Sequence, residues 1–482
     1  MKRFDVIIIG GGAVGCAVAY TLSKYDLSVA LLERNPDVAM GTSGKNSAVV
    51  HAGFNNRPGS LMARLCVEGN ARFESLCKTL DVPYKRTGKL VIGFSDADMA
   101  IVEQIIADGR RNGCEGLERI GPEKMKELEP AIAGSGALYS ANTAVFDTFL
   151  YTIHLCEAAI QNGVSFFMNT EVTAVRKESG SFIVAGGKDE FEGEILVNSA
   201  GLYADKVSAM AGDSSFSIYP CRGEYFILDP CAAELISRPV YPVPRQGVGG
   251  LGVHLTTAID GSVLIGPGAE YIDNREDYAT TQAMMDALFK EARQIIPALR
   301  QDMIIGSYAG IRPKLVPRGQ VNYGDFIIEE SRKVANLINL IGIESPGLTA
   351  SMPIAEMVAG IIKAKRPLAE NTGYKAEYHR SIPFASLDGE SQDALIGGNA
   401  DYGRVVCRCK TVTKAEIVKA LHNPLGVHTV VSVKNRVHAT MGRCQGGYCL
   451  AKIMNIIMAE YTLPPEEVCY RRPGDMPLFG SM

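Results

Sequence analysis

The sequence lacks both long apolar runs and clusters of basic residues. Its N-terminal apolar stretch lies within residues 4–9 and is followed by glycines, which is far short of the roughly 18 residues that span a bilayer. The 482 residues carry a formal net charge of −4, so no positive field attracts nucleic acid. We therefore expect a cytoplasmic protein that has neither a signal peptide nor a membrane anchor and binds no nucleic acid.

Histidines are few, and most cysteines stand alone. With 7 histidines, the chain has a small set of side chains that accept protons near neutral pH. Of the 12 cysteines, four near the C-terminus are spaced like ligands and eight are scattered, as in a protein of a reducing compartment. We interpret these eight as packing residues: Cys16, Cys66, Cys77, Cys114, Cys156, Cys221, Cys231 and Cys469.

The length and the hydrophobic content predict more than one domain. Hydrophobic residues make up 46% of the chain, and a chain of this length divides into two domains or more. Residues 374–403 are rich in Gly, Asn, Asp and Ser and lack periodic apolar residues. This composition predicts a linker, which we place at residues 376–402.

A glycine-rich loop near the N-terminus predicts a dinucleotide site. Residues 4–34 are typical of a strand, a small-residue helix and a second strand that ends at Glu33. Gly10, Gly12 and Gly15 supply the G-x-G-x-x-G pattern between the first strand and the helix, which permits a tight turn and close approach to a pyrophosphate. A glycine-rich turn without a ligand is the alternative, and the pattern alone does not separate FAD from NAD.

Motifs spread over three quarters of the chain favour FAD. Residues 41–47 (GTSGKNS), 51–53 (HAG), 198–205 (NSAGLYAD) and 308–313 (YAGIRP) resemble the D-amino-acid-oxidase-like superfamily of FAD enzymes, over about residues 4–370. The resemblance implies an α/β fold in which a Rossmann-like FAD-binding domain is interleaved with an α+β substrate domain built on an antiparallel sheet. Within one oxidoreductase domain of residues 1–375, it places the FAD-binding part at about 1–80, 140–210 and 315–375, and the substrate part at about 81–139 and 211–314.

The same resemblance implies which residues hold FAD. The N-terminus of the first helix would face the pyrophosphate, and Glu33 would bind the ribose. Val172 would contact the adenine through its backbone. The implied set is Gly10, Gly12, Ala13, Val14, Gly15, Glu33, Arg34, Thr42, Ser43, Asn46, Ser47, Val172, Ala200, Gly201, Gly310, Gly342, Gly347, Leu348 and Thr349.

Two groups within the superfamily are similar to this sequence: glycerol-3-phosphate oxidases and dehydrogenases, and L-2-hydroxyglutarate oxidases. Residues 46–53 and 222–226 suit both groups, 253–256 favour the hydroxyglutarate group, and 308–313 and 342–346 favour the glycerophosphate group. We expect a small anionic hydroxy substrate. Oxidation of glycerol 3-phosphate to dihydroxyacetone phosphate is our first hypothesis, and L-2-hydroxyglutarate or another 2-hydroxy acid is the alternative.

Oxidation of a secondary alcohol by a flavin requires a base for the hydroxyl proton. The resemblance brings His51 to the flavin, so His51 is our candidate base, and a histidine that merely holds the flavin is the alternative. His254 is its competitor. Arg312 matches the substrate-binding arginine of the superfamily and can hold a carboxylate or phosphate bidentately, unless it forms a surface salt bridge. Ser345 would touch the substrate.

The four C-terminal cysteines have the spacing of a metal centre. Cys407 and Cys409 form a C-x-C pair, and 34 residues later Cys444 and Cys449 form a C-x4-C pair. Four thiolates suit a 2Fe-2S cluster, whereas zinc prefers C-x2-4-C knuckles; zinc and free thiols remain alternatives. Residues 403–455 resemble the bacterioferritin-associated ferredoxin-like 2Fe-2S domain, which implies a cluster-binding domain and tail over 403–482.

A flavin and a cluster on one chain indicate a dehydrogenase, because transfer of electrons to oxygen needs no cluster. Arg408, Lys410 and Arg443 would offset the negative charge of the cluster. We expect an electron-accepting protein subunit, such as a second flavoprotein or a quinone-linked protein, and membrane association through that partner stays open. Two other functions also stay open: oxidation of an amine or amino acid, and a subunit for electron transfer or sensing whose partner is catalytic.

Overall fold

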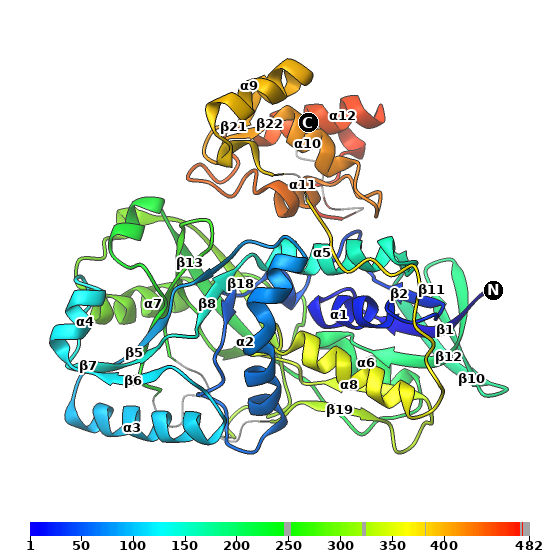
Figure 1. Ribbon diagram of the computed structural model, residues 1–482, viewed down its shortest axis with the longest axis horizontal. Coiled ribbons are helices and arrows are strands. Elements are labelled where there is room, and N and C mark those ends of the chain that lie inside the picture. Colours follow the sequence, from blue (N-terminus) through cyan, green and yellow to red (C-terminus); the bar gives the residue numbers. More distant parts are fainter. Residues whose placement is uncertain (245–251, 321–323, 381, 473–474, 476–482) are drawn as a thin grey trace.

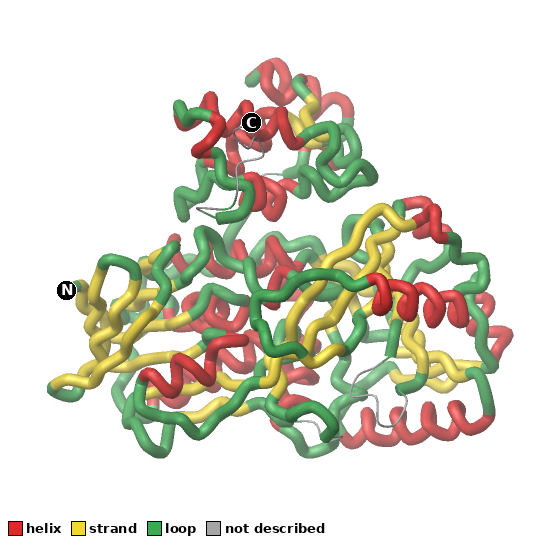
Figure 2. The backbone as a smooth tube through the Cα atoms, turned by 180° about the vertical axis from the view of Figure 1, so that it is seen from behind, coloured by secondary structure: helices red, strands yellow, loops and turns green. Residues whose placement is uncertain are grey.

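The computed structural model describes residues 1–244, 252–320, 324–380, 382–472 and 475. They form a sheet flanked by helices, a second sheet beside it, and a smaller C-terminal lobe that lies over both (Figures 1 and 2). The chain reaches this lobe along an extended path over the surface of the first part (Figure 1). The end of the predicted tail, residues 473–474 and 476–482, lies outside the described residues.

The first sheet has eight strands in the order β10-β11-β12-β1-β2-β9, and β20 pairs with β12 and β19 with β20. β1 runs parallel to β12 and β2, as in a dinucleotide-binding fold. Residues 6–9 of β1 are buried on both faces, which explains their continuous apolar run. The strands are β1 (Lys2–Ile9), β2 (Val29–Leu32), β9 (Ser165–Phe167), β10 (Val172–Glu178), β11 (Ser181–Gly186), β12 (Asp189–Asn198), β19 (Ile327–Glu330) and β20 (Leu337–Ile341).

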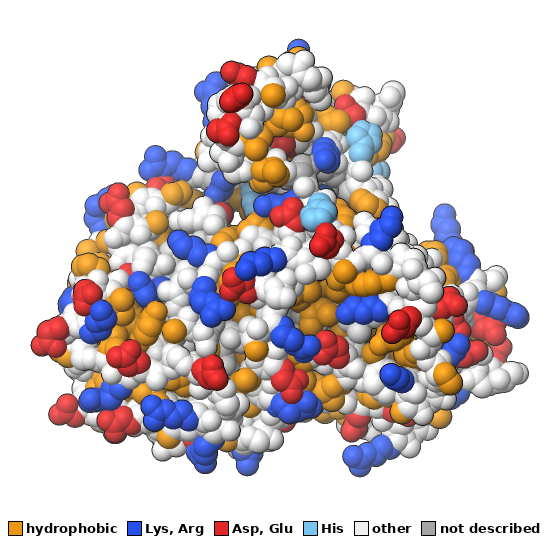
Figure 3. Space-filling model, viewed as in Figure 1, with side chains coloured by type: hydrophobic (Ala, Val, Ile, Leu, Met, Phe, Trp, Pro, Cys, Tyr) orange, Lys and Arg blue, Asp and Glu red, His pale blue; other side chains and the backbone are white. Residues whose placement is uncertain are grey.

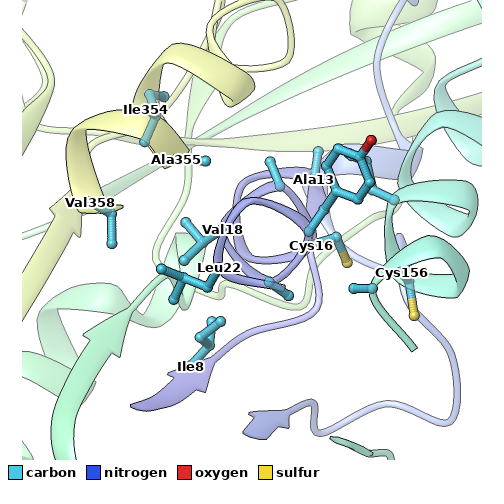
Figure 4. Packing of buried hydrophobic residues seen from close by; sticks show 14 of the residues in the cluster. Ile8, Ala13, Cys16, Val18, Leu22, Cys156, Ile354, Ala355 and Val358 are labelled. Carbon is cyan, nitrogen blue, oxygen red and sulfur yellow. The ribbon is translucent and has the colours of Figure 1, made fainter. Parts of the chain in front are cut away.

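Helix α1 (Ala13–Leu22) lies between α5 (Thr148–Gln161) and α8 (Ser351–Lys363) and packs on both. Figure 4 shows Cys16 of α1 near Cys156 of α5, and Val18 of α1 facing α8. All residues of α1 except Val14 are buried, so small side chains are required where three backbones approach. The remaining helices of this part are α2 (Leu61–Thr79), α6 (Ala204–Met210), η1 (Thr42–Gly44) and η2 (Gly201–Tyr203).

The second sheet has nine strands in the order β17-β13-β16-β15-β14-β5-β7-β6, with β18 on the free side of β13. Its pairs are antiparallel except β14 with β5. The strands are β5 (Lys89–Gly93), β6 (Leu117–Ile120), β7 (Gly136–Ser140), β13 (Tyr219–Leu228), β14 (Val240–Pro242), β15 (His254–Thr257), β16 (Val263–Gly266), β17 (Glu270–Tyr271) and β18 (Ile304–Lys314). The helices around it are α3 (Asp96–Arg111), α4 (Pro122–Leu128), α7 (Gln282–Ile295), η3 (Pro230–Glu234) and η4 (Gln301–Met303).

A small sheet and the C-terminal lobe complete the described chain. β3 (Val49–Val50), β8 (Ala144–Phe146) and β4 (Tyr84–Arg86) form a three-stranded sheet. The segment that we expected to be a linker, 376–402, contains η5 (Phe384–Ser386) and α9 (Gly389–Gly398). The lobe has its own apolar core and consists of η6 (Ala400–Gly403), β21 (Val405–Cys407), β22 (Val412–Thr413), α10 (Lys414–Leu421), α11 (Val430–Val437), α12 (Leu450–Tyr461) and η7 (Pro465–Glu467). Across the described ranges, no helix is both long and apolar enough to cross a membrane.

Charged side chains attach the lobe to the rest of the protein. Arg436 of α11 is 7% exposed and lies 2.5 Å from the Asp37 carboxylate and 3.4 Å from that of Glu157. His438 forms a second ion pair, at 2.7 Å, with Asp147, the residue that caps α5. Figure 3 shows basic, acidic and histidine side chains gathered along this seam. Because their partners are fixed in the core, these pairs set the orientation of the lobe.

Replacing Arg436 by alanine is expected to loosen the lobe. The change leaves two buried carboxylates without their cation, at a cost of about 3–5 kcal/mol. Cleavage within residues 376–402 by a low dose of thermolysin should become faster. Arg300→Ala, which breaks an exposed pair with Asp302, should leave the cleavage rate unchanged; equal rates for both variants would show that Arg436 does not hold the lobe.

Candidate functional site

A cavity of about 580 Å³ lies where the two large sheets meet. Its wall is formed by the loop after β1, the start of α1, the segment 40–60, and residues of β13, β15 and β18. This volume lies within the range of sites for small ligands and cofactors. Both the FAD-binding and the substrate parts expected from the sequence therefore contribute to one site.

The glycine loop presents backbone amides to this cavity. Gly10 has φ +108° and a Cβ there would lie 2.6 Å from the Ser199 carbonyl oxygen, so only glycine fits. A Cβ on Gly15 would lie 2.0 Å from the Gly10 carbonyl oxygen, which explains how α1 packs so closely on β1. Gly12, the N-cap of α1, makes no side-chain cap bond, and Ser43 Oγ accepts the amide of Ala13 at 2.9 Å. The positive end of the helix therefore faces the cavity, as a pyrophosphate requires.

Glu33 lies at the other side of this loop. Its carboxylate accepts hydrogen bonds from the backbone amides of Gly11, at 2.6 Å, and Asn35, at 2.9 Å. Burial raises the pKa of Glu33 even though these amides and Arg34 oppose the shift. The donors fix one carboxylate at the end of β2, where a ribose hydroxyl would bind. Glycine loop, exposed helix end and fixed acid together fit the adenosine diphosphate half of FAD.

The structure brings most of the expected residues into the wall of this cavity, including His51, His254, Arg312 and Ser345. Three of the expected FAD residues are not in the wall: Gly15, Val172 and Gly342. Gly15 packs α1 on β1, and a Cβ on Gly342 would lie 2.4 Å from Leu315 Cδ1, so both glycines act through packing. The expected FAD residues that do line the cavity are Gly10, Gly12, Ala13, Val14, Glu33, Arg34, Thr42, Ser43, Asn46, Ser47, Ala200, Gly201, Gly310, Gly347, Leu348 and Thr349.

His51 follows β3 and is held by its backbone. Its amide donates to Thr349 Oγ1 at 3.0 Å, and its carbonyl accepts from Asn70 Nδ2 at 3.1 Å. The imidazole Nε2 lies 3.3 Å from Ser345 Oγ. Burial and the nearby charge of Lys89 lower the pKa of His51 to about 3. The ring is therefore neutral at neutral pH and has a nitrogen available to accept a proton.

Arg312 and His254 enter the cavity from neighbouring parts of the second sheet. The Arg312 guanidinium donates to the Gly268 carbonyl oxygen at 2.5 Å, and among the described residues it has no carboxylate partner. His254 stacks on Tyr241 with ring centroids 3.7 Å apart, and its Nδ1 donates to the Gly252 carbonyl oxygen at 3.0 Å. This bond leaves Nε2 of a neutral His254 as an acceptor, and burial lowers the pKa of His254 well below its ordinary value.

Lys89 is a cavity residue that the sequence did not reveal. It begins β5, is 1% exposed, and lines the cavity. Its ammonium lies 3.9 Å from the centre of the Tyr241 ring and 4.7 Å from that of Phe54. Burial lowers the pKa of Lys89 to about 7. In the sequence, a lysine at the start of an apolar strand predicts a solvent-exposed strand end. Only the fold shows that two aromatic rings, distant in the sequence, enclose the Lys89 ammonium.

The four C-terminal cysteines lie in two pairs. Cys409 Sγ and Cys444 Sγ are 3.8 Å apart and exposed. Cys407 and Cys449 are buried, and burial together with the adjacent Cys407 raises the pKa of Cys449 to about 12. A Cβ on Gly442 would lie 2.2 Å from Cys409 Cβ, so glycine is required where the two cysteine loops touch.

Two pairs of thiols fit the two irons of a 2Fe-2S cluster. Within the described part of the chain, no three His, Cys, Asp or Glu side chains gather closely enough for a single metal ion. Lys410 and Arg443 were expected to offset the cluster charge, but they pair with Asp260 and Asp229 of the second sheet region. Arg408 instead lies 4.5 Å from the centre of the Tyr448 ring.

Comparison with known proteins agrees with this architecture. The family "FAD dependent oxidoreductase" matches residues 5–361, and the BFD-like 2Fe-2S binding domain matches residues 405–459. A glycerol 3-phosphate dehydrogenase of Caloramator mitchellensis is 36% identical over 480 residues, covering 99% of this chain and 98% of its own. The mitochondrial L-2-hydroxyglutarate dehydrogenase of Arabidopsis thaliana is 32% identical over 404 residues, 74% of this chain and 83% of its own.

A solved structure supports the fold of most of the chain. Dithionite-reduced L-alpha-glycerophosphate oxidase from Mycoplasma pneumoniae, with FAD bound, superimposes with a TM-score of 0.74 and is 28% identical, over 79% of this chain and 100% of that one. L-proline dehydrogenase from P. horikoshii shares the fold, with a TM-score of 0.67 and 21% identity over 78% of this chain and 96% of its own. The chain belongs to the FAD dependent oxidoreductase family, and its C-terminal BFD-like domain adds a 2Fe-2S cluster to the FAD.

Proposed function

We propose that this protein oxidises glycerol 3-phosphate to dihydroxyacetone phosphate and passes the electrons through its 2Fe-2S cluster to a partner protein. The observation that carries the proposal is the presence, in one cavity, of a neutral histidine, His51, and an arginine, Arg312, that has no carboxylate partner in the described part of the chain. The relative from Caloramator mitchellensis and the oxidase from Mycoplasma pneumoniae support the choice of substrate.

Each step uses a side chain of the cavity. Arg312 holds the phosphate bidentately and so fixes the distance from the anion to the carbinol. His51 Nε2 takes the hydroxyl proton, while Ser345 Oγ, 3.3 Å away, is placed to hydrogen-bond the same oxygen. A bound FAD would supply the hydride acceptor for the carbinol carbon. The alcohol loses one proton and one hydride, so the products are a ketone and protonated His51, which returns its proton to solvent.

The strand β18 connects this cavity to the cluster. At one end, Gly310 and Arg312 line the cavity. Near the other end, a Cβ on Gly306 would lie 3.4 Å from Gln445 Oε1, so the loop that follows Cys444 packs on the same strand. Cys409 and Cys444 are exposed on the lobe. This arrangement supports a path for electrons from the flavin to the cluster and from the cluster to a protein outside.

One observation favours a second substrate, L-2-hydroxyglutarate. Lys89 on β5 and Arg312 on β18 lie on strands that β13, β16, β15 and β14 separate in the second sheet, yet both line the same cavity. Two cationic side chains in one cavity match a substrate that has a carboxylate at each end. Glycerol 3-phosphate has one anionic end and places a hydroxyl towards the second cation.

Anaerobic mixing with each substrate is the test of the function. Glycerol 3-phosphate should bleach the flavin absorbance, and the EPR signal of a reduced 2Fe-2S cluster should follow. The Cys409→Ser variant should keep the bleaching and lose the EPR signal, whereas Cys231→Ser, at an exposed cysteine outside the two ligand pairs, should keep both. Bleaching by L-2-hydroxyglutarate alone would select the second substrate, and bleaching by neither would refute both.

Replacing Arg312 should remove substrate affinity. Without the guanidinium, the substrate anion loses its charge partner. The kcat/KM for flavin reduction in Arg312→Ala should therefore decrease, and the decrease should correspond to a loss of about 2–5 kcal/mol of transition-state stabilisation. Arg312→Lys should recover part of the loss, because an ammonium keeps the charge but not the bidentate geometry. Arg293→Ala removes an exposed cation from α7 and serves as control. An unchanged kcat/KM in Arg312→Ala, with FAD still bound, would place the anion elsewhere.

The charge of Lys89 should govern how His51 titrates. Below pH 7 Lys89 is charged and opposes protonation of His51. In Lys89→Met this opposition is gone, so the pKa of His51 rises and the acid limb of kcat/KM should move to higher pH by about 1 unit. Ionisation of the substrate is the same for both proteins, so the difference between their profiles isolates His51. Superimposable profiles would contradict the assignment of His51 as base, and Lys452→Met, at an exposed site of the lobe, is the control.

A further inference from the structure

The mouth of the FAD cavity carries more positive charge than the protein itself neutralises. Arg34 and Lys45 line the cavity, and the C-terminal lobe adds Lys434 of α11 and two arginines of the tail, Arg471 and Arg472. Among the described residues, Glu276 pairs with two of these five cations, at 2.5 Å from Arg34 and 3.6 Å from Arg472. Glu33 also lies beside Arg34, and Asp475 accepts the backbone amide of Arg472 at 3.1 Å.

The tail is held against the cavity mouth by specific bonds. The Cys469 and Tyr470 carbonyl oxygens accept from the amides of Val430 and Val431, at 3.2 and 2.9 Å, which ties the tail to α11. The Arg471 guanidinium then donates to the Met40 carbonyl oxygen at 2.9 Å. Arg471 therefore meets the loop that leads from Met40 into η1.

The same loop reaches the N-terminus of α1. Ser43 Oγ, in η1, accepts the amide of Ala13 at 2.9 Å, at the helix end that a pyrophosphate requires. Lys45, which follows η1, places its ammonium 3.1 Å from the centre of the Tyr278 ring, and Arg471 lies 5.7 Å from that centre. Cations from both sides thus meet at Tyr278, which is itself part of the cavity wall.

Three of these five cations lack an acidic partner among the described residues. Within the described residues, neither Lys45, Lys434 nor Arg471 forms an ion pair with a carboxylate. Burial, followed by the charges of Arg471, Arg472 and Lys434, lowers the pKa of Lys45 to about 7. Uncompensated cations that are partly buried require an anion from outside the protein.

We propose that Lys45, Lys434 and Arg471 bind the pyrophosphate of FAD, so that the C-terminal lobe, besides holding the cluster, closes the flavin site. A pyrophosphate carries two negative charges next to the helix end and matches the excess of cations in sign and position. The flavin domain and the cluster domain thereby share one cofactor. This inference concerns FAD retention and is independent of which alcohol the protein oxidises.

The test compares FAD binding in single-charge variants of the full-length protein. Arg471→Gln and Lys434→Gln should each weaken FAD binding about 10- to 100-fold, the effect of one charged hydrogen bond, as measured by the quenching of flavin fluorescence on titration into unloaded protein. Arg471→Lys should lose less. Arg332→Gln removes one cation from an exposed site and should bind FAD as the unaltered protein does.

The iron content of each variant distinguishes a loss of FAD binding from a loss of folding of the C-terminal lobe. If Arg471→Gln keeps its iron and binds FAD weakly, the proposal is upheld. Unchanged FAD affinity in both Arg471→Gln and Lys434→Gln would overturn it, as would an unchanged FAD affinity with a raised KM, which would assign these cations to the substrate phosphate. If Arg471→Gln loses iron, the test uses Lys434→Gln and Arg471→Lys instead. Full FAD affinity in both of these variants, with iron retained, would refute the proposal.

FAD binding should also take up a proton. The groups that face Lys45 are Glu276 and Tyr278, Lys434 of α11, and Arg471 and Arg472 of the tail. Without FAD, Lys45 loses its proton near pH 7. The negative charge of a bound pyrophosphate would offset the charges of the neighbouring cations, so the pKa of Lys45 would rise towards its ordinary range. FAD affinity should therefore fall as pH rises from 7 to 9. A Lys45→Met variant should show a flatter profile, and identical slopes for the two proteins would exclude Lys45 from the site.

Discussion

Two close contacts between backbones determine the shape of the site. A Cβ on Gly15 would lie 2.0 Å from the carbonyl oxygen of Gly10, and a Cβ on Gly310 would lie 2.0 Å from that of Lys45. The first contact sets α1 against β1, so that the first amides of the helix point into the cavity. The second contact sets β18 of the second sheet against the loop after η1. Because any side chain at Gly15 or Gly310 would push these layers apart, the cofactor cavity depends on glycine more than on any long side chain.

The sequence predicted those parts of the site whose chemistry is local. The strand–loop–helix order and the glycine spacing identify the loop at Gly10, since the required backbone conformations are set within six residues. Lys89 shows what local patterns miss: its neighbours Phe54 and Tyr241 are far from it in sequence, so its burial follows only from the pairing of β5 with β14. The segment 376–402 shows a second limit, because a composition rich in Gly and Asp did not exclude the capped helix α9.

Ion pairs orient the C-terminal lobe, and their directionality explains why they can do so. Apolar surfaces attract without direction, whereas a guanidinium and a carboxylate fix both distance and angle. Arg436 contacts Asp37 and Glu157, and Lys410 contacts Asp260, so the lobe is pinned over both large sheets. A buried pair contributes little net stability compared with apolar packing. Its contribution is a fixed position for the cysteine loops relative to β18, and transfer of electrons between two centres needs a fixed separation.

The charged side chains of the cavity differ in whether they have partners within the protein. Its carboxylates are occupied: Glu33 accepts backbone amides, and Glu344 pairs with Lys314. Arg312 and Lys89 have no such partners among the described residues. Cations held in this way destabilise the empty protein, because their desolvation is not repaid. Anions that bind them repay it, so cofactor and substrate stabilise the same conformation that uses them. We propose that these side chains, which weaken the unliganded fold, are also those that bind the substrate anion.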